Sequence, residues 1–242
     1  MSKLKTFKAL KPSRKMLSLL LAAVMVVPAG MYSMSSSTQD AKALEIHEAA
    51  EGKKLVDCFP DENFATYVYT DVLKKCNLDT NKSTYTLTAD DVTKIKTETK
   101  TINVSDKDIK SLSGIENFTA LINLICNDNR INNIDLSKNT NLVKLIANKT
   151  DINHLDLSNN RNLRELNVSG TDITNLDLSN NKYLRELHAS DADLINLDIS
   201  KNIWLIKLII SDNYINKLDL SNNVNLQHID VSNNYINNLD LS

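Results

Sequence analysis

The chain of 242 residues has little glycine and little proline, with 4 residues of the first and 3 of the second. A collagen helix needs glycine at every third position and a disordered low-complexity chain is rich in proline, so both classes are excluded. Aromatic residues are also scarce, at 5%, whereas 42% of the chain is hydrophobic and 24% is charged. Because this apolar fraction is enough for a core, a folded globular or repeat protein of one or two domains remains.

The net charge of −2 conceals an uneven distribution along the chain. Counting Lys and Arg against Asp and Glu gives +6 for residues 1–43, −3 for residues 44–100 and −5 for residues 101–242. The chain beyond its first segment is therefore acidic. Because negative charge repels a phosphate backbone, we expect no nucleic-acid partner.

Residues 1–43 have the order of an export signal and its flanking leader. A basic stretch is followed by an apolar run at residues 16–27 and then by small polar residues. A membrane-spanning helix needs about 20 apolar residues, so this run favours a cleaved signal, with cleavage after Ala43 or Ala29. The alternative is an uncleaved anchor that extends to Met34. We expect a secreted or cell-surface protein with no membrane contact apart from this signal.

A period of 21 residues organises residues 99–242. The tetrapeptide Leu-Asp-Leu-Ser begins at residues 155, 176, 218 and 239, and variants of it begin at residues 134 and 197. Between these tetrapeptides, apolar residues such as Leu166 and Val168 stand two apart, which is the period of a strand. One such coil cannot bury its apolar face alone, so coils must stack and add one parallel strand each. The pattern predicts a solenoid of about seven coils, the last one incomplete.

These repeats resemble leucine-rich repeat proteins, specifically the short-repeat bacterial type related to internalins. The resemblance covers about residues 99–242. It implies an arc with parallel β-strands on the concave face and short turns on the convex side, used for binding and adhesion rather than catalysis. One column departs from the family, because the position that is usually Asn reads Asn129, Thr150, Thr171, Ala192, Asn213 and Asn234. Since Thr replaces only one hydrogen bond of Asn and Ala none, we expect the coils around 150–192 to be looser or rewired.

Two polar columns recur with the full period. The first is Asn139, Asn160, Asn181, Asn202 and Asn223; the second is Asp135, Asp156, Asp177, Asp198, Asp219 and Asp240. An Asn amide carries donors and an acceptor, so the first column is predicted to satisfy backbone groups in each bend. Stacked carboxylates repel, so the Asp column needs partners, which are either turn N–H groups near the following Ser or calcium between coils.

Residues 44–98 lack the period and are predicted to form a small helical cap over the first coil. Pro60 is followed by two acidic residues, as is typical of a helix start. Apolar residues at Phe64, Val68 and Val72 then give one helical stripe. A cap is needed because the first coil of a solenoid otherwise exposes its core.

Part of this cap resembles a degenerate EF-hand loop, as carried by similar caps in related exported bacterial proteins. Its candidate calcium ligands are Asp79, Asn81, Ser83, Tyr85, Asp90 and Asp91. Thr84 stands where the loop needs Gly, so the segment is either a weak calcium site or a relic that binds no metal. Apart from calcium here or between coils, no cofactor or metal is expected.

The three cysteines at positions 58, 76 and 126 cannot all be paired with one another. Cys126 occupies an inward strand position and is predicted to be a small buried hydrophobic residue. Cys58 and Cys76 flank the cap helix, whose ends would be about 24 Å apart over about 16 residues, so a bridge between them requires the chain to double back.

The outward strand positions are the candidate ligand-binding surface. They form two columns. The first is Lys144, Glu165, Glu186 and Lys207; the second is Ile125, Ile146, Asn167, His188, Ile209 and Asp230. The core does not require apolar residues there, so the three isoleucines indicate either a protein-binding surface or ordinary β-formers that stiffen the sheet. Glu165, Glu186 and His188 converge on this face, but their spacing does not define a catalytic or metal site.

Four aromatic residues mark a flank of the repeats. Tyr183 and Trp204 stand one repeat apart, as do Tyr214 and Tyr235. Each pair is predicted to be neighbours in space. Such rings occur at interfaces and bind sugars, and the alternative is structural stacking along the flank.

The sequence therefore predicts an exported, non-catalytic recognition module. A protein ligand at a bacterial or host cell surface is the favoured partner, with a cell-surface glycan as the second candidate. Two alternatives remain, namely a targeting or spacer arm of a larger surface enzyme and a self-associating structural surface protein.

Overall fold

The structure is a computed structural model that describes residues 49–75, 82–237 and 239–240. All of them belong to one compact unit, Ala41–Ser242. The predicted export signal lies outside the described residues, as do Cys76, Asp79 and Asn81. Within the described ranges, no helix is both long and apolar enough to cross a bilayer.

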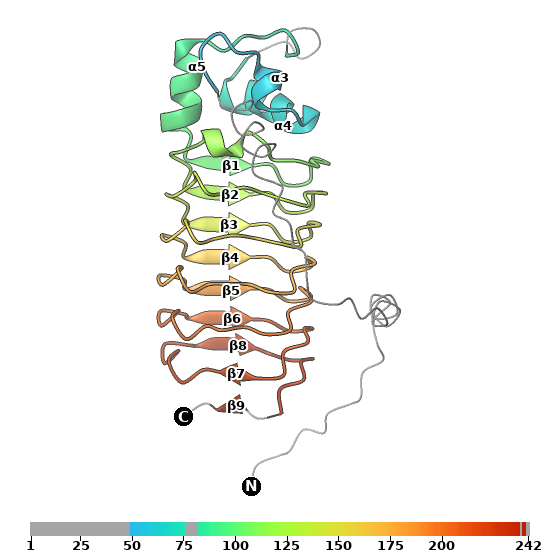
Figure 1. Cartoon of the computed structure of the whole chain (residues 1–242), viewed down its shortest axis with the longest axis vertical. Helices are drawn as coiled ribbons and strands as arrows, with labels where there is room; N and C mark the ends of the chain where they lie inside the picture. The colour runs from blue at the N-terminus through green and yellow to red at the C-terminus, as the bar shows by residue number, and fades with distance from the viewer. Residues whose placement is uncertain (1–48, 76–81, 238, 241–242) are drawn as a thin grey trace, which may run out of the picture. The chain divides into compact units, whose positions relative to one another are not determined.

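The repeats form a stack of coils, each of which contributes one short parallel strand to a seven-stranded sheet (Figure 1). The seven-stranded sheet consists of β1 Thr101–Asn103, β2 Asn123–Ile125, β3 Lys144–Ile146, β4 Glu165–Asn167, β5 Glu186–His188, β6 Lys207–Ile209 and β8 His228–Asp230. A second, two-stranded sheet pairs β7 Leu218–Asp219 with β9 Leu239–Asp240. In the main sheet, strands pair in the order in which they occur, so the predicted parallel solenoid is confirmed.

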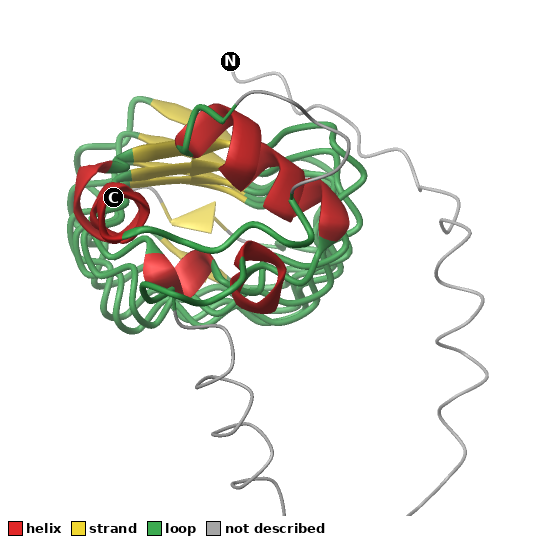
Figure 2. Ribbon diagram, turned by 90° about the horizontal axis from the view of Figure 1, so that it is seen from above, coloured by secondary structure: helices red, strands yellow, loops and turns green. Residues whose placement is uncertain are grey.

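The core lies behind the strands and runs through the whole stack. The middle residue of each strand from β2 to β6 points inward and is fully buried, namely Leu124, Leu145, Leu166, Leu187 and Leu208. Viewed along the stack, most strands gather on one side of the coils, and mainly loops complete the other sides (Figure 2). Ile229 in β8 is 42% exposed, because β8 is the last strand of this sheet.

The buried Asn column ties each bend to the bend of the preceding coil. The Asn160 side-chain amide donates to the main-chain oxygens of Leu136 at 3.1 Å and of Asn139 at 3.0 Å. The other four members, Asn139, Asn181, Asn202 and Asn223, donate in the same way. The predicted role of this column is therefore confirmed. The side-chain oxygens of all five accept no hydrogen bond within the described part of the chain.

The column that varies between Asn, Thr and Ala is rewired where Asn is missing. The Asn129 amide donates to the oxygen of Val104 in the preceding coil, at 2.8 Å, and also to its own coil. Thr150 instead donates to Ala147, and Thr171 to Val168, so each hydroxyl bonds only within its own coil. The shorter Thr side chain therefore satisfies a carbonyl without linking two coils.

Short helical segments precede the first coil. They are α3 Leu55–Cys58, α4 Glu62–Tyr67, the π-helical turn η1 Val68–Val72, α5 Ala89–Thr93 and the π-helical turn η2 Lys94–Glu98, and a 3₁₀ turn, η3 Ile115–Asn117, follows β1. Asp61 caps α4, because its carboxylate accepts the main-chain N–H groups of Asn63 and Phe64. The same carboxylate accepts the N–H groups of Lys110 at 2.9 Å and Ser111 at 3.1 Å. One side chain thus starts the cap helix and fixes it to the repeats.

Three aromatic rings join the cap to the first coil. Phe59 lies 5.6 Å from Phe64 and 5.8 Å from Phe118 between ring centroids, and all three are fully buried. The Tyr67 hydroxyl accepts the N–H of Asn103 in β1 at 3.1 Å. The cap therefore covers the first coil's apolar core, and its Tyr67 hydroxyl satisfies a main-chain N–H group at the edge of β1.

Candidate ligand-binding faces

The outward side chains of the main sheet form a surface that we call the sheet face. It contains all ten predicted residues, Ile125, Lys144, Ile146, Glu165, Asn167, Glu186, His188, Lys207, Ile209 and Asp230. The strand register aligns Lys144 with Glu165 and Glu186 with Lys207. The structure therefore brings these residues together in two columns, one coil apart at each step.

Charge on the sheet face is partly paired. The Lys144 ammonium lies 2.8 Å from the Glu165 carboxylate. The His188 ring nitrogen Nε2 lies 3.8 Å from the Glu186 carboxylate. Burial lowers the pKa of His188 below its ordinary value, and the positive charge of Lys207 lowers it further. The imidazole is therefore neutral near neutral pH and offers one donor and one acceptor.

The isoleucines of the sheet face fall into two places. Ile125 and Ile146 are register partners in β2 and β3, whereas Ile209 is the register partner of His188. All three are half-buried. Asn167 in β4 and His188 in β5 lie between Ile146 and Ile209 in this column. The column of Lys144 and Glu165 lies on one side of Ile146, and the next alternate positions on the other side are the polar Asn127 and Asn148. Apolar side chains with polar and charged neighbours are typical of a protein interface.

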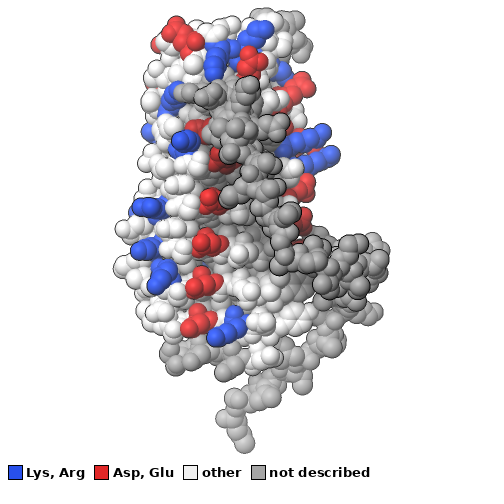
Figure 3. Space-filling view, viewed as in Figure 1, with Lys and Arg blue, Asp and Glu red and all other residues white. Residues whose placement is uncertain are grey.

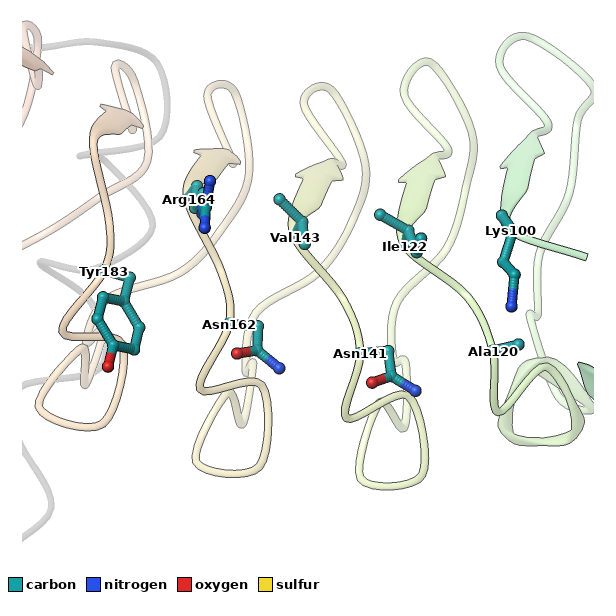
Figure 4. Close-up of a pocket in the computed structure, with 8 residues that line it drawn as sticks. All are labelled: Lys100, Ala120, Ile122, Asn141, Val143, Asn162, Arg164 and Tyr183. Atoms are coloured by element: carbon teal, nitrogen blue, oxygen red, sulfur yellow. The ribbon is translucent and has the colours of Figure 1, made fainter.

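A groove lies on the flank of the coils, beside the segments that lead into the strands (Figure 4). We call it the flank groove; it has a volume of about 540 Å³ and is lined by Lys100, Ala120, Ile122, Asn141, Val143, Asn162, Arg164 and Tyr183. Only Tyr183 among these residues is predicted from the sequence. Ile122 and Val143 lie one period apart, each directly before the first residue of a strand. The repeat motif does not require apolar residues at this position, so this pair is the sequence signal that could have indicated the groove.

The aromatic flank divides into two different pairs. Tyr214 and Tyr235 stack, with ring centroids 6.2 Å apart and an angle of 16° between the rings. Tyr183 and Trp204 are 57% and 52% exposed, and the described residues show no ring contact between them. Structural stacking therefore explains the first pair, while the second pair presents open rings to solvent.

The Asp column is held by hydrogen bonds in the turns. One carboxylate oxygen in each of Asp135, Asp156, Asp177, Asp198 and Asp219 accepts the N–H of the Ser two residues later, at 2.8–2.9 Å. The Ser179 N–H lowers the pKa of Asp177, although Asp156 and Asp198 raise it slightly through like charge. The predicted pairing with turn N–H groups is confirmed. Figure 3 shows acidic side chains that follow one another in a lengthwise row on the face that it draws.

In the segment that resembles an EF-hand, the candidate calcium ligand Asp91 forms its contacts within the cap. Asp91 is 4% exposed and accepts hydrogen bonds from the Tyr85 hydroxyl at 2.5 Å and from the Thr88 N–H at 3.0 Å. Its other oxygen lies 3.1 Å from the Lys75 ammonium. Burial raises the pKa of Asp91, but these hydrogen bonds outweigh burial and leave it lowered. The two alternatives for this segment, a weak calcium site and a relic that binds no metal, both stay predictions, because Asp79 and Asn81 lie outside the described residues.

The two described cysteines are buried. Burial raises the pKa of the Cys126 thiol to about 12, so it behaves as a small apolar side chain in the strand column. Burial likewise raises the pKa of Cys58. A bridge between Cys58 and Cys76 is not tested, because Cys76 lies outside the described residues. Among the described residues, no three His, Cys, Asp or Glu side chains are placed to hold a metal ion together.

Comparison with known proteins identifies the fold. The sequence matches no protein-family model and no curated protein. Among solved structures, it matches the functional domain of InlJ from Listeria monocytogenes, which includes a cysteine ladder, with 26% identity and a TM-score of 0.51 over 81% of this chain and 50% of that one. It also matches the internalin InlF of the same organism, with 23% identity and a TM-score of 0.63 over 78% of this chain and 61% of that one. The chain thus spans about half of the InlJ structure and less than two thirds of InlF.

A third match covers nearly all of its counterpart. Internalin C2 from Listeria monocytogenes has 21% identity and a TM-score of 0.66, over 81% of this chain and 93% of that one. Sequence identities at this level support a shared architecture, and the strand order and 21-residue register described above agree with it. The chain has the leucine-rich repeat fold in the bacterial, internalin-like form.

Proposed function

We propose that the chain is a non-catalytic, extracellular recognition module that binds a protein ligand at a bacterial or host cell surface through its sheet face. Solenoids of this kind use extended surfaces for binding, since each coil adds side chains to the same face. The internalin-like fold supports an interaction module in general, and the exported location rests on the order of residues 1–43.

The observation that carries the proposal is the apolar pair on the outward side of β2 and β3. The inward residues of these strands, Leu124 and Leu145, are already fully buried, so the core is complete without Ile125 and Ile146. The ion pair of Lys144 and Glu165 lies in the adjoining register column. An apolar centre with a charged residue pair beside it is an arrangement that a protein ligand can desolvate.

Capture of labelled surface proteins from bacterial and mammalian cells by the immobilised chain tests the proposal. We expect Ile125→Asp and Ile209→Asp each to weaken capture by at least about tenfold, because an interface would bury the new carboxylate without a partner. Ile195→Asp is the matched control, since Ile195 is an isoleucine outside the sheet face that is 49% exposed. Capture that survives both sheet-face substitutions would exclude this face.

A further inference from the structure

Four cations gather on the flank in two successive coils. Arg161 and Lys182 occupy one repeat position, Arg164 and Arg185 occupy another, and all four side chains are exposed. We call them the flank cluster. None of the four forms an ion pair with any residue that the structure describes, whereas Lys144, Lys149 and Arg130 do. Unpaired positive charge in a chain that is otherwise acidic concentrates an attractive field for anions.

Open aromatic rings lie within this cluster. Tyr183 follows Lys182 in the chain and forms part of the wall of the flank groove, at the same end as Arg164 (Figure 4). Trp204 takes the same repeat position in the next coil, and both rings are about half exposed. A sugar ring has an apolar C–H face that packs on an aromatic ring and polar groups at its edges, so such rings suit a saccharide.

The polar wall of the flank groove offers hydrogen-bond acceptors. The Asn141 amide donates to the Thr119 oxygen at 3.0 Å, and the Asn162 amide donates to the Thr140 oxygen at 3.2 Å. The side-chain oxygens of these two Asn residues accept no hydrogen bond from any described residue. A ligand rich in hydroxyl donors complements them.

We propose that the flank groove and the flank cluster together bind an anionic glycan, a saccharide chain that carries carboxylate or sulfate groups. Arg164 and Arg185 hold the acidic groups with charge-assisted hydrogen bonds, Tyr183 and Trp204 pack against the sugar rings, and Asn141 and Asn162 accept from hydroxyl groups. This site uses none of the ten residues of the sheet face and lies beside the segments that lead into the strands, so it adds a second partner to the proposed protein ligand.

Dextran sulfate, a sulfated glucan, is the probe, and unsulfated dextran is its uncharged control. We expect the full chain to bind dextran sulfate but not dextran. The double variant Arg164→Ala/Arg185→Ala should weaken binding by at least about tenfold, because it removes the charge-assisted hydrogen bonds to the acidic groups. The matched variant Lys138→Ala/Lys217→Ala removes the same charge at exposed positions elsewhere and should change the Kd by less than about twofold.

Two further measurements separate the glycan from other readings. Tyr183→Ala leaves the charge unchanged and should weaken binding of dextran sulfate by about fivefold, through the lost ring contact. Ile125→Asp, on the sheet face, should bind dextran sulfate like the wild type even if it abolishes protein capture. Equal losses in the two double variants would reduce the effect to general attraction and overturn the proposal. Poly-L-glutamate that binds as tightly as dextran sulfate and ignores Tyr183→Ala would assign the site to an acidic polypeptide instead.

Discussion

The side-chain amide of Asn160 donates to the main-chain oxygen of Asn139, 21 residues earlier, at 3.0 Å. The same bond recurs at every step of this column, from Asn139 to Asn223. At this bend of each coil a buried side chain supplies the donors, so neither glycine nor proline is needed there. A second bend in each coil uses the left-handed backbone conformation, with positive φ at Asp128, Lys149, Gly170, Asp191, Asp212 and Asn233, and only one of these six residues is glycine.

Loss of one member of this column should weaken the stack. Asn181→Ala removes hydrogen bonds to Leu157 at 3.1 Å and to Asn160 at 2.9 Å. We expect the free energy of unfolding to fall by roughly 2 kcal/mol, since each buried bond contributes about 1 kcal/mol. Asn181→Asp should cost more at neutral pH, because it also buries a carboxylate. Urea unfolding measures both, and exposed Asn180→Ala should leave the midpoint unchanged; equal midpoints for all three variants would contradict this role.

Gly114 should be irreplaceable at the junction of cap and repeats. Its φ of 99° disfavours any side chain, and a Cβ there would overlap the Cys58 carbonyl and lie 2.5 Å from the Phe59 ring. We expect Gly114→Ala to reduce the free energy of unfolding by more than about 3 kcal/mol. Gly52→Ala is the control: its φ is 83° with nothing within 4 Å, so it should cost only about 1 kcal/mol. Similar thermal shifts for both variants would show that the contact is unimportant.

The buried carboxylate of Asp91 should stabilise the cap locally. Asp91→Asn replaces the acceptor of the short Tyr85 bond and leaves Lys75 without its partner. We expect a loss of about 2 kcal/mol, confined to the cap, because hydrogen bonds to charged groups contribute about that much. Hydrogen exchange should then accelerate in residues 85–98 and stay slow in β3 to β6. Asp90→Asn, at the exposed neighbour, serves as the control, and uniform acceleration along the chain would argue against a local role.

The Asp column should make stability depend on acid pH. Main-chain N–H groups of the following Ser residues, with their hydroxyls, lower the pKa of Asp156 and Asp198 below the ordinary value of 3.8. A lowered folded-state pKa means that this contribution is present above pH 3.8 and is lost as the pH falls through the folded-state value. The triple variant Asp156→Asn/Asp177→Asn/Asp198→Asn replaces three carboxylates with amides. Each amide oxygen can still accept the hydrogen bond, but it does not titrate.

This triple variant should therefore show a smaller fall in urea midpoint than the wild type between about pH 5 and about pH 3. Asp151→Asn should retain the wild-type dependence, since the described residues form no hydrogen bond with the Asp151 carboxylate. A triple variant as acid-sensitive as the wild type would indicate that other groups control this transition.

The spacing of residues in the sequence correctly predicts burial and turn hydrogen bonds where each coil repeats the same environment. Leu166 and Val168 are buried as their two-residue spacing requires, and the Ser179 N–H meets Asp177 because both lie in one turn. The sheet face follows from the same alternation, since residues beside an inward residue must point outward. Spacing is less informative for side chains outside the motif, and so the flank groove was missed apart from Tyr183.

By itself, the sequence determined the solenoid, its parallel strands and the two polar columns, because a 21-residue period forces equivalent residues into equivalent contacts. Tertiary structure alone decided which aromatic pair stacks and which stays open, and how Thr150 and Thr171 replace Asn. It also decided that Ile122, Val143 and Arg164 line one groove, and that Gly114 admits the Phe59 ring. These outcomes depend on the side-chain geometry of residues far apart in the chain, which a repeat pattern does not specify.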